Sequence, residues 1–369
     1  MTVAVHNYDL AVVGSGFAAA ATAFHLSRRF AGSMVLLEKE KTPGAHASGR
    51  NASLLLQSVA DPAIRRCAAA SQRAYAEISE TIDFARVGSL LLGDERRIES
   101  VRETEIVSSR RLAPEELRRR IPLLEGHAFE AALETPGDGV IDTWALLSFY
   151  LAEARERGVE LVTDAEITRI DGGPPFHLHT TQGVIKARHI INAAGAWAAD
   201  LACLAGVEPP PLRPLKRHLF VLDDVSSVPP DWPFVWDIQH HFYFRPESGG
   251  LLFSICDEEE QANRLETVSP GIEEALAEKA PRFLPSLTQA TVRRVWSCYR
   301  TFAGDDRFVI GWDPEQEGFF WVAGLGGHGM GCSWEVGRLA AMAYLGEDDR
   351  SDQEKTNPFD VARFAPALV

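Results

Sequence analysis

The pattern of apolar and polar positions over the first forty residues predicts a strand, a helix and a second strand. An apolar run at residues 8–13 ends in Gly14-Ser15-Gly16, an alanine-rich stretch continues to Arg29, and a second apolar run occupies residues 34–37. A strand, a glycine turn, a helix and a strand in this order form a βαβ unit. The pattern therefore indicates an α/β fold with a parallel sheet.

Two later apolar runs, at residues 187–192 and 318–323, also predict buried strands. The first continues into small residues at 193–196 and the second into a glycine cluster at 324–327. Small residues let a ligand approach the backbone at the carboxyl edge of a sheet. We therefore expect both segments to lie beside a ligand.

Residues 209–300 have a different texture, with prolines at 209–211 and 229–230 and an aromatic strand around Phe242 and Phe244. This texture is typical of an antiparallel sheet with turns. We expect a Rossmann-like nucleotide-binding domain with a parallel sheet, and an inserted α+β substrate domain with an antiparallel sheet. The expected boundaries are residues 1–84, 142–208 and 301–369 for the first domain and 85–141 and 209–300 for the second.

Composition narrows the class of protein. The 369 residues are 46% hydrophobic and 24% charged, which is typical of a globular chain. The net charge of −15 disfavours nucleic acid and anionic lipid as partners. The five cysteines are scattered, no basic and apolar leader opens the sequence, and no apolar run approaches the roughly 18 residues of a membrane span. We expect a cytoplasmic protein without a membrane span.

The first glycine turn carries a nucleotide-binding pattern, Gly14-x-Gly16-x-x-Ala19, and Glu38 ends the following strand. Glycines allow a pyrophosphate to approach the backbone at a helix N-terminus, and the acidic residue accepts a hydrogen bond from a ribose hydroxyl. The alternative is a structural turn without a ligand. Because the strand, helix and glutamate are in register, the pattern favours dinucleotide binding.

Three further segments combine with this motif into a family pattern. They are the small-residue loop Pro43-Gly44-Ala45-His46-Ala47-Ser48-Gly49-Arg50-Asn51-Ala52, the run Asn192-Ala193-Ala194-Gly195-Ala196-Trp197, and Gly324-x-Gly326-Gly327-His328-Gly329-Met330. Together they resemble the D-amino-acid oxidase family of flavoproteins over nearly the whole chain. Within it, residues 137–143, 242–246 and 317–323 resemble bacterial D-amino-acid dehydrogenases of the D-arginine dehydrogenase type.

The resemblance implies FAD as the cofactor. A second glycine cluster is also what a flavin ring needs if amides at a helix N-terminus are to stabilise negative charge on it, although such a cluster can be only a packing turn. His46 either contacts the flavin ring or only packs near it. The candidate cofactor-binding residues are Gly14, Gly16, Ala19, Glu38, Lys39, His46, Ser48, Gly49, Arg50, Asn51, Ala52, Ile167, Ala194, Gly195, Trp197, Gly326, Gly327, His328, Gly329 and Met330.

The resemblance also implies three candidate catalytic residues. Arg300 matches the arginine that holds the substrate carboxylate, for which a planar bidentate donor is suited, the alternative being a surface arginine. Tyr243 matches a tyrosine that lines the substrate pocket, although aromatic strands are also typical of cores. The family's second carboxylate-binding arginine aligns with His218, with Arg217 one residue away.

Departures from the D-arginine dehydrogenase pattern concern the substrate side chain. Leu54, Leu55, Leu56 and Val59 replace polar residues and a tyrosine, and Ser89 stands where an acidic residue would recognise a cation. A guanidinium would lack its carboxylate partner. We therefore expect a neutral, apolar side chain.

The expected activity is FAD-dependent oxidative deamination of a neutral D-amino acid, with hydride transfer from Cα to flavin N5 and reoxidation by dioxygen or a quinone. One alternative is an oxidase or dehydrogenase of N-methyl or cyclic secondary amino acids, or of a 2-hydroxy acid. Another is a flavin-binding electron-transfer subunit without its own substrate. An NAD-dependent dehydrogenase would leave the C-terminal glycine cluster unexplained.

Two further expectations concern cysteine and metal. Cys298 aligns with the cysteine that bonds covalently to the flavin in the monomeric sarcosine oxidases of this family, but it lies among bulky residues, and we predict a dissociable FAD with a thioether as the alternative. His177-x-His179 and His240-His241 contain ligand-type residues. We expect no metal, because these pairs show no carboxylate or thiolate at helpful spacing.

Overall fold

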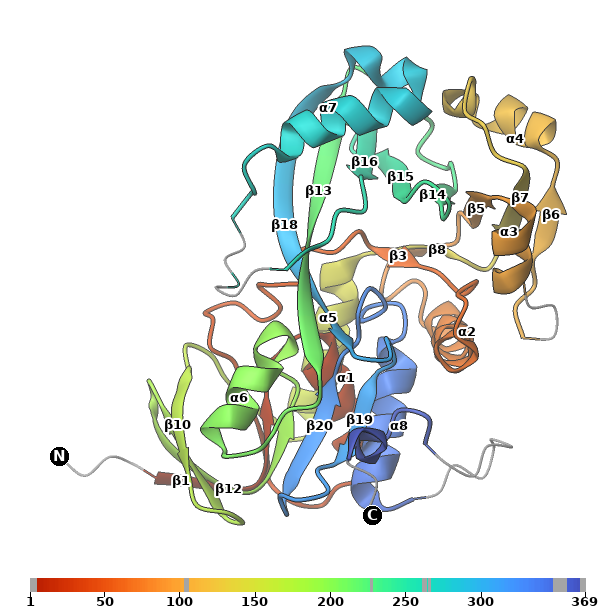
Figure 1. The fold of residues 1–369 in the computed structure, drawn as a ribbon. Coiled ribbons are helices and arrows are strands. Elements are labelled where there is room, and N and C mark those ends of the chain that lie inside the picture. Colours follow the sequence, from red (N-terminus) through yellow and green to blue (C-terminus); the bar gives the residue numbers. More distant parts are fainter. Residues whose placement is uncertain are drawn as a thin grey trace. The chain divides into compact units, whose positions relative to one another are not determined.

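The computed structural model describes residues 5–102, 106–225, 228–260, 264, 267–347 and 357–365, and Figure 1 shows the order of the elements. Residues 1–4, which enter the expectation about the N-terminus, lie outside the described residues. The chain divides into two compact units. The first unit comprises Met1–Gly49, Thr143–Leu215 and Arg300–Val369, and the second comprises Arg50–Asp142 and Lys216–Tyr299.

The first unit is built on an eight-stranded sheet with a parallel centre. β20, β12, β1, β2 and β9 pair in parallel in that order, while β10, β11 and β19 add antiparallel pairs. The predicted strand–turn–helix–strand order is therefore confirmed at residues 5–37. The strands are β1 (Val5–Val13), β2 (Met34–Leu37), β9 (Glu160–Val162), β10 (Ile167–Asp171), β11 (Phe176–Thr180), β12 (Gly183–Asn192), β19 (Val309–Trp312) and β20 (Phe319–Ala323).

Two helices of the first unit, α5 and α8, pack against α1. Close approach of α8 to α1 requires a glycine, because a Cβ on Gly337 would lie 2.5 Å from the carbonyl carbon of Ala21. Four of the five alanines of α1 are buried, so these small side chains serve packing. The helices are α1 (Phe17–Leu26), α5 (Thr143–Glu156), α6 (Ala198–Leu204) and α8 (Ser333–Leu345).

The second unit contains a nine-stranded, mainly antiparallel sheet in the order β17-β13-β16-β15-β14-β5-β7-β6, with β18 paired to β13. β14 and β5 pair in parallel. Its core includes a stack of phenylalanines, Phe242, Phe244 and Phe253. The strands are β5 (Ser89–Gly93), β6 (Arg110–Leu112), β7 (Ala131–Thr135), β13 (Leu212–Asp223), β14 (Phe234–Asp237), β15 (Phe242–Glu247), β16 (Gly250–Ser254), β17 (Glu259–Glu260) and β18 (Thr291–Ala303).

Residues 50–84 differ from the expected division, because they lie in the second unit. A small sheet joins β3 to β8 and β8 to β4, which ties both ends of this segment to residues 139–141. Within the segment, Asp61 caps α2 by accepting hydrogen bonds from the amides of Ala63 and Ile64. The remaining elements are β3 (Leu54–Leu55), β4 (Phe84–Ala85), β8 (Gly139–Ile141), α2 (Pro62–Glu77), α3 (Glu95–Val101), α4 (Pro114–Arg120) and α7 (Ile272–Phe283).

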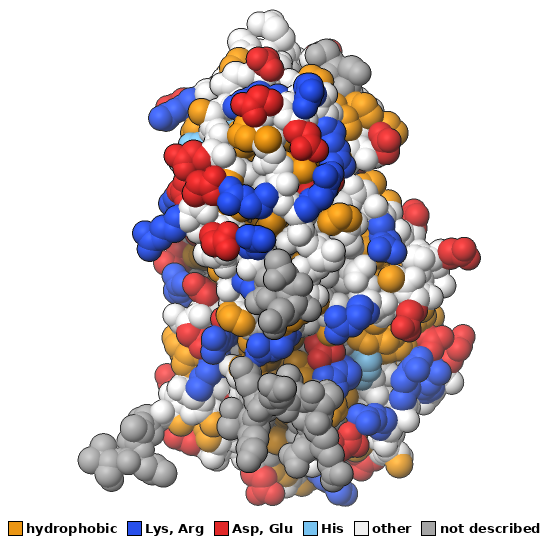
Figure 2. Space-filling view, turned by 90° about the vertical axis from the view of Figure 1, so that its right-hand side faces the viewer, with side chains coloured by type: hydrophobic (Ala, Val, Ile, Leu, Met, Phe, Trp, Pro, Cys, Tyr) orange, Lys and Arg blue, Asp and Glu red, His pale blue; other side chains and the backbone are white. Residues whose placement is uncertain are grey.

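The architecture confirms the predicted α/β class. Within the described part of the chain, every helix is too short or too polar to traverse a bilayer. Figure 2 shows that positive and negative side chains are interspersed on the face drawn. The net charge of −15 is therefore not gathered into a single acidic patch on that face.

Candidate functional site

The predicted nucleotide turn joins β1 to α1, and both of its glycines lie close to neighbouring atoms. Gly14 has a φ of +109°, and a Cβ there would lie 2.6 Å from the carbonyl oxygen of Ala193. A Cβ on Gly16 would lie 2.6 Å from Ser48 Oγ. The turn is thus a narrow backbone cradle at the N-terminus of a ten-residue helix, which fits the pyrophosphate of a dinucleotide.

Two side chains hold this cradle in place. Ser48 Oγ accepts a hydrogen bond of 3.0 Å from the Phe17 amide and so caps α1, because Gly16 has no side chain to do this. Glu38, at the end of β2, accepts 2.5 Å and 3.1 Å hydrogen bonds from the hydroxyl and amide of Ser15. The carboxylate predicted to bind a ribose is therefore fixed beside the glycine turn.

A second group of predicted cofactor residues gathers around Trp197. The Lys39 ammonium lies 3.3 Å from the ring centroid of Trp197, and the His46 ring lies 4.4 Å from it. His46 Nε2 also pairs with Glu40 Oε1 at 2.9 Å. Lys39, His46 and Trp197 come from three separate motifs of the sequence. The structure therefore brings residues from distant segments into contact.

The segment after β12 is held by Asn192. Its side-chain amide donates to the Ala198 carbonyl at 2.7 Å, and its Oδ1 accepts from the Ala194 amide at 3.3 Å. Gly195 has a φ of +57°, and a Cβ there would meet nothing within 4 Å. This segment therefore presents open backbone at the carboxyl end of a parallel strand, as predicted from its small residues.

The C-terminal glycine cluster lies beside Arg300. Gly324 and Gly326 have positive φ values of 68° and 54°, and the Gly326 amide donates to the Thr301 carbonyl at 2.8 Å. A Cβ on Gly327 would lie 3.7 Å from an Arg300 guanidinium nitrogen. Arg300 and the predicted flavin-facing turn are therefore neighbours within the first unit.

The amides of this turn are not all available to a ligand. The cluster precedes α8, which begins only at Ser333, and the His328 amide already donates to the Leu325 carbonyl at 3.0 Å. Met330 is buried and its sulfur accepts from the Thr143 hydroxyl at 3.8 Å. Gly329 has no atom closer than 3.7 Å to its Cβ position. The turn thus offers backbone at Gly327 and Gly329 rather than the first turn of a helix.

The other predicted cofactor residues are more dispersed. Ala19 is buried in α1, and Ile167 opens β10, where it pairs with Thr180. The Gly49 amide donates to the His46 carbonyl at 3.0 Å and closes the small-residue loop. Arg50, Asn51 and Ala52 lie in the second unit, where the Arg50 carbonyl accepts from Trp296 Nε1 and the Ala52 carbonyl accepts from Arg245 Nε.

Tyr243 lies in the second unit within a small apolar cluster, which we call the Tyr243 cluster. Its ring centroid is 5.2 Å from that of Trp236. The members share aromatic or apolar side chains and are Tyr243, Leu219, Leu252, Ala52, Leu54, Trp236, Cys256 and Trp296. Leu54, one of the residues that depart from the D-arginine dehydrogenase pattern, therefore packs against this cluster, while Leu55, Leu56 and Val59 are buried.

His218 is fully buried, and both nitrogens of its ring are occupied. Nδ1 pairs with Asp257 Oδ2 at 2.7 Å, and Nε2 accepts a 3.0 Å hydrogen bond from the Ser269 amide. Because Nε2 accepts, the hydrogen bond to Asp257 is donated by Nδ1. Its neighbour Arg217 hydrogen-bonds the Asp257 carbonyl and Glu258. The assignment of His218 or Arg217 to a substrate carboxylate stays a prediction.

Ser89 leads to a buried acid that the sequence did not single out. Ser89 Oγ donates to Asp138 Oδ2 at 2.6 Å, and the amide and side chain of Gln57 donate to Asp138 Oδ1 at 3.1 Å and 2.9 Å. Burial raises the pKa of Asp138 to about 7, against the lowering effect of these hydrogen bonds. Ser89, which stands where an acidic residue was predicted to be missing, therefore donates a hydrogen bond to the acid Asp138 of the segment 137–143.

Cys298 is buried in β18. Burial is what the packing alternative expects of a free thiol, whereas attack on a flavin needs an activated thiolate. The prediction of a dissociable FAD therefore stays in place.

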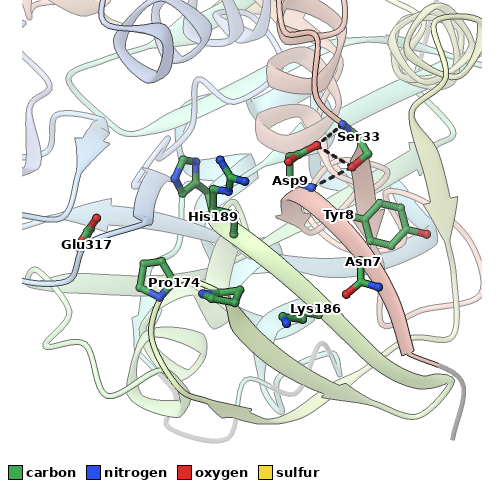
Figure 3. A pocket seen from close by; sticks show the side chains of 10 residues that line it. Asn7, Tyr8, Asp9, Ser33, Pro174, Lys186, His189 and Glu317 are labelled. Atoms are coloured by element: carbon green, nitrogen blue, oxygen red, sulfur yellow. Dashed lines mark hydrogen bonds between the residues drawn. The ribbon is translucent and has the colours of Figure 1, made fainter.

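A separate cavity of about 520 Å³ lies beside β1 and β12 of the first-unit sheet, away from the carboxyl ends of these strands (Figure 3). It is lined by the amino-terminal part of β1, including Asp9, and by Lys186 and His189 of β12. Asp9 is engaged by the amide and hydroxyl of Ser33 at 2.8 Å and 2.9 Å. Because parallel strands of this kind bind nucleotides at their carboxyl ends, this cavity is distinct from the glycine cradle.

Comparisons with known proteins agree with this geometry. A family model described as FAD dependent oxidoreductase (DAO) matches residues 9–343. Mitochondrial dimethylglycine dehydrogenase of Homo sapiens is 28% identical over 97% of this chain, which spans 44% of that protein's length.

Two solved structures share the fold. L-proline dehydrogenase from P. horikoshii has a TM-score of 0.84 at 22% identity, covering 94% of this chain and 96% of that one. Glycine oxidase from Geobacillus kaustophilus has a TM-score of 0.82 at 25% identity, covering 97% and 99%.

Proposed function

Because the chain belongs to the FAD dependent oxidoreductase family, its cofactor is FAD, and we propose that it oxidises a small neutral amino acid whose nitrogen carries an alkyl substituent. The observation that carries this proposal is the similarity to a dimethylglycine dehydrogenase over nearly the whole chain. Glycine oxidase, the solved structure at 25% identity, is also named for a small amino acid. The two substrates differ only in methylation of the nitrogen.

The residues of the first unit fit the cofactor. The glycine cradle would hold the pyrophosphate, a Cβ at Gly14 or Gly16 would collide with Ala193 or Ser48, and Ser48 and Glu38 hold the cradle. When bound, the flavin accepts a hydride from a carbon attached to the substrate nitrogen. The chain itself needs only to bind and orient the substrate so that this carbon faces the flavin.

Arg300 is the residue proposed to bind the substrate carboxylate. Its guanidinium lies beside Gly327, and a guanidinium binds a carboxylate through two parallel hydrogen bonds. Two bonds fix the direction of the substrate as well as its position. A carboxylate held in this way leaves the amine end free to be oriented by other groups.

An apolar substituent on the substrate is proposed because Tyr243, which the family resemblance implies for the substrate pocket, lies in the apolar Tyr243 cluster. All eight of its members are apolar or aromatic, and Ser89 is bonded to the buried Asp138 rather than to an exposed carboxylate. An N-methyl group and an aliphatic side chain are both apolar. The cluster therefore also supports the second candidate, a neutral D-amino acid, and neither candidate requires a cation-binding acid.

Product analysis tests the proposal. The purified flavoprotein is supplied with N-methylglycine, N,N-dimethylglycine, glycine, D-leucine and D-arginine in turn, together with an artificial electron acceptor. We expect the N-methyl substrates to be oxidised fastest and to release formaldehyde in proportion to acceptor reduced. Faster oxidation of D-leucine, with release of ammonia, would favour the second candidate. Failure of every amino acid would favour an electron-transfer subunit.

A further inference from the structure

Three side chains of the second unit converge on one point although they are far apart in the sequence. They are His127, in the loop after the 3-10 helix Pro122–Leu124, Asp237 at the end of β14, and His240 in the turn before β15. One ligand-type atom from each lies within 4.8 Å of the other two. His127 Nε2 is 2.6 Å and His240 Nδ1 is 3.0 Å from the same oxygen, Asp237 Oδ2.

The other carboxylate oxygen orients the group. Asp237 Oδ1 accepts hydrogen bonds of 2.9 Å and 2.6 Å from the amides of Gln239 and His240. These bonds fix the carboxylate so that Oδ2 faces both imidazoles. The amide of His127 donates to the Leu124 carbonyl and its carbonyl accepts from Arg118, which holds the third residue in place. Outer hydrogen bonds of this kind are what orient the ligands of a metal site.

The surroundings are aromatic and largely closed to water. The side chains of His127 and Asp237 are 1% and 0% exposed, whereas that of His240 is 24% exposed. The ring of His240 packs on Phe283 at 4.5 Å, and the ring of His127 lies 5.4 Å from that of Phe242. The group is therefore reached from solvent through His240 alone of the three.

The geometry points to a site for one divalent transition-metal ion, with zinc as the best fit, held by His127 Nε2, Asp237 Oδ2 and His240 Nδ1. Two imidazole nitrogens and a carboxylate oxygen are a donor set that zinc prefers. With bonds of about 2.0–2.1 Å in a tetrahedral site, neighbouring donors lie about 3.3 Å apart. His240 Nδ1, at 3.0 Å from Asp237 Oδ2, is close to that separation, whereas His127 Nε2, at 2.6 Å, must withdraw by about 0.7 Å.

An imidazole binds an ion through the lone pair of a ring nitrogen. The nitrogens of His127 and His240 that face Asp237 therefore carry no proton when the ion is bound. A water molecule supplies the fourth ligand from the exposed side of His240. Such an ion would join the loop at residue 127 to the β14–β15 turn within the second unit.

Metal titration of the intact flavoprotein tests this inference. The protein is stripped with a chelator, and zinc is added in competition with a chromophoric chelator. We expect one zinc ion per chain in the wild type, and at least about 100-fold weaker binding in His240→Gln. His240 is chosen because it is the most exposed ligand. The flavin absorption spectrum of each variant shows that the protein is folded.

Neighbouring variants separate this site from surface binding. His241→Asn removes an adjacent, exposed histidine whose φ of +56° suits asparagine, and it should bind zinc like the wild type. Cobalt added to the wild type should give the visible bands of a tetrahedral ion, and these should be absent in His240→Gln. Equal zinc binding in wild type and His240→Gln, loss of binding in His241→Asn, or no stoichiometric zinc in the wild type would overturn the inference.

Discussion

The two units of this chain differ in what carries their chemistry. In the first unit the candidate site is mainly backbone: the turn at Gly14 and Gly16, the open segment at Gly195, and the glycine cluster beside Arg300. In the second unit it is side chains from distant strands, as in the Tyr243 cluster and the Asp138 network. A site made of backbone can be predicted from a short stretch of sequence, whereas a site made of side chains from distant strands forms only when the sheet is assembled.

The largest effect is expected from closing the backbone cradle. Gly16→Val places a side chain where the Cβ alone would lie 2.6 Å from Ser48 Oγ, so we expect loss of FAD. The ratio of flavin to protein absorbance after purification measures it. Gly173→Val is the matched control, because its Cβ would be 3.8 Å from the nearest atom and its φ is not positive. Normal FAD content in Gly16→Val would show that the cradle is not part of the cofactor site.

A smaller but still large effect is expected at Arg300. Arg300→Lys replaces a bidentate donor by a point charge and should lower kcat/KM by about 100-fold, equivalent to about 3 kcal/mol, while FAD stays bound. Steady-state kinetics with N,N-dimethylglycine measure this. Arg213→Lys, at an exposed arginine paired with Asp306, should leave kcat/KM unchanged. Equal kinetics in both variants would place the carboxylate elsewhere.

The features that could be predicted from the sequence are also those made of backbone and local segments, and the features that could not are those made of distant side chains. The βαβ unit and the glycine turn were predictable, because each depends on short segments with fixed roles, whereas the contacts of Lys39 and His46 with Trp197 depend on the fold. The placement of residues 50–84 was not, since it depends on pairing of β3 and β4 with β8. The acid bonded to Ser89 comes from 49 positions away, which no spacing rule identifies.

The His127 group shows the same limit. Asp237 lies only three positions before His240, so two of the three members are close together in the sequence, but the prediction considered only the His240-His241 pair. The third member, His127, is 110 positions away and depends entirely on the fold.

The titration of Asp138 should have an effect of intermediate size, which is a dependence of the free energy of unfolding on pH. Its pKa rises from 3.8 to about 7 in the folded protein. Between these values the folded chain keeps a proton that the unfolded chain has lost, so the free energy of unfolding falls as pH rises through this window and is level above it. The fall amounts to at most about 4 kcal/mol, since one pKa unit is about 1.4 kcal/mol.

Asp138→Asn removes this titration while keeping the shape of the side chain and partners for Gln57 and Ser89. Urea unfolding across the window measures both proteins. We expect the variant to lose less stability than the wild type as the pH rises. Identical pH profiles would show that Asp138 does not titrate in this range.

The smallest effect is expected at Cys298. Cys298→Ala should leave FAD content and its release unchanged, because burial in an apolar environment disfavours the thiolate that a thioether needs. Acid precipitation followed by flavin measurement in the pellet and the supernatant checks this. Flavin that stays with the wild-type pellet and is lost from the pellet of Cys298→Ala would establish a covalent bond instead.

The central claim is that the first unit binds FAD and that an amino acid reduces this flavin. Anaerobic mixing with excess N,N-dimethylglycine tests it most directly, with the main visible absorption band of the flavin as the signal. We predict rapid bleaching of the wild type and bleaching slowed by about 100-fold in Arg300→Lys. A flavin that dithionite bleaches but no amino acid bleaches would contradict the account.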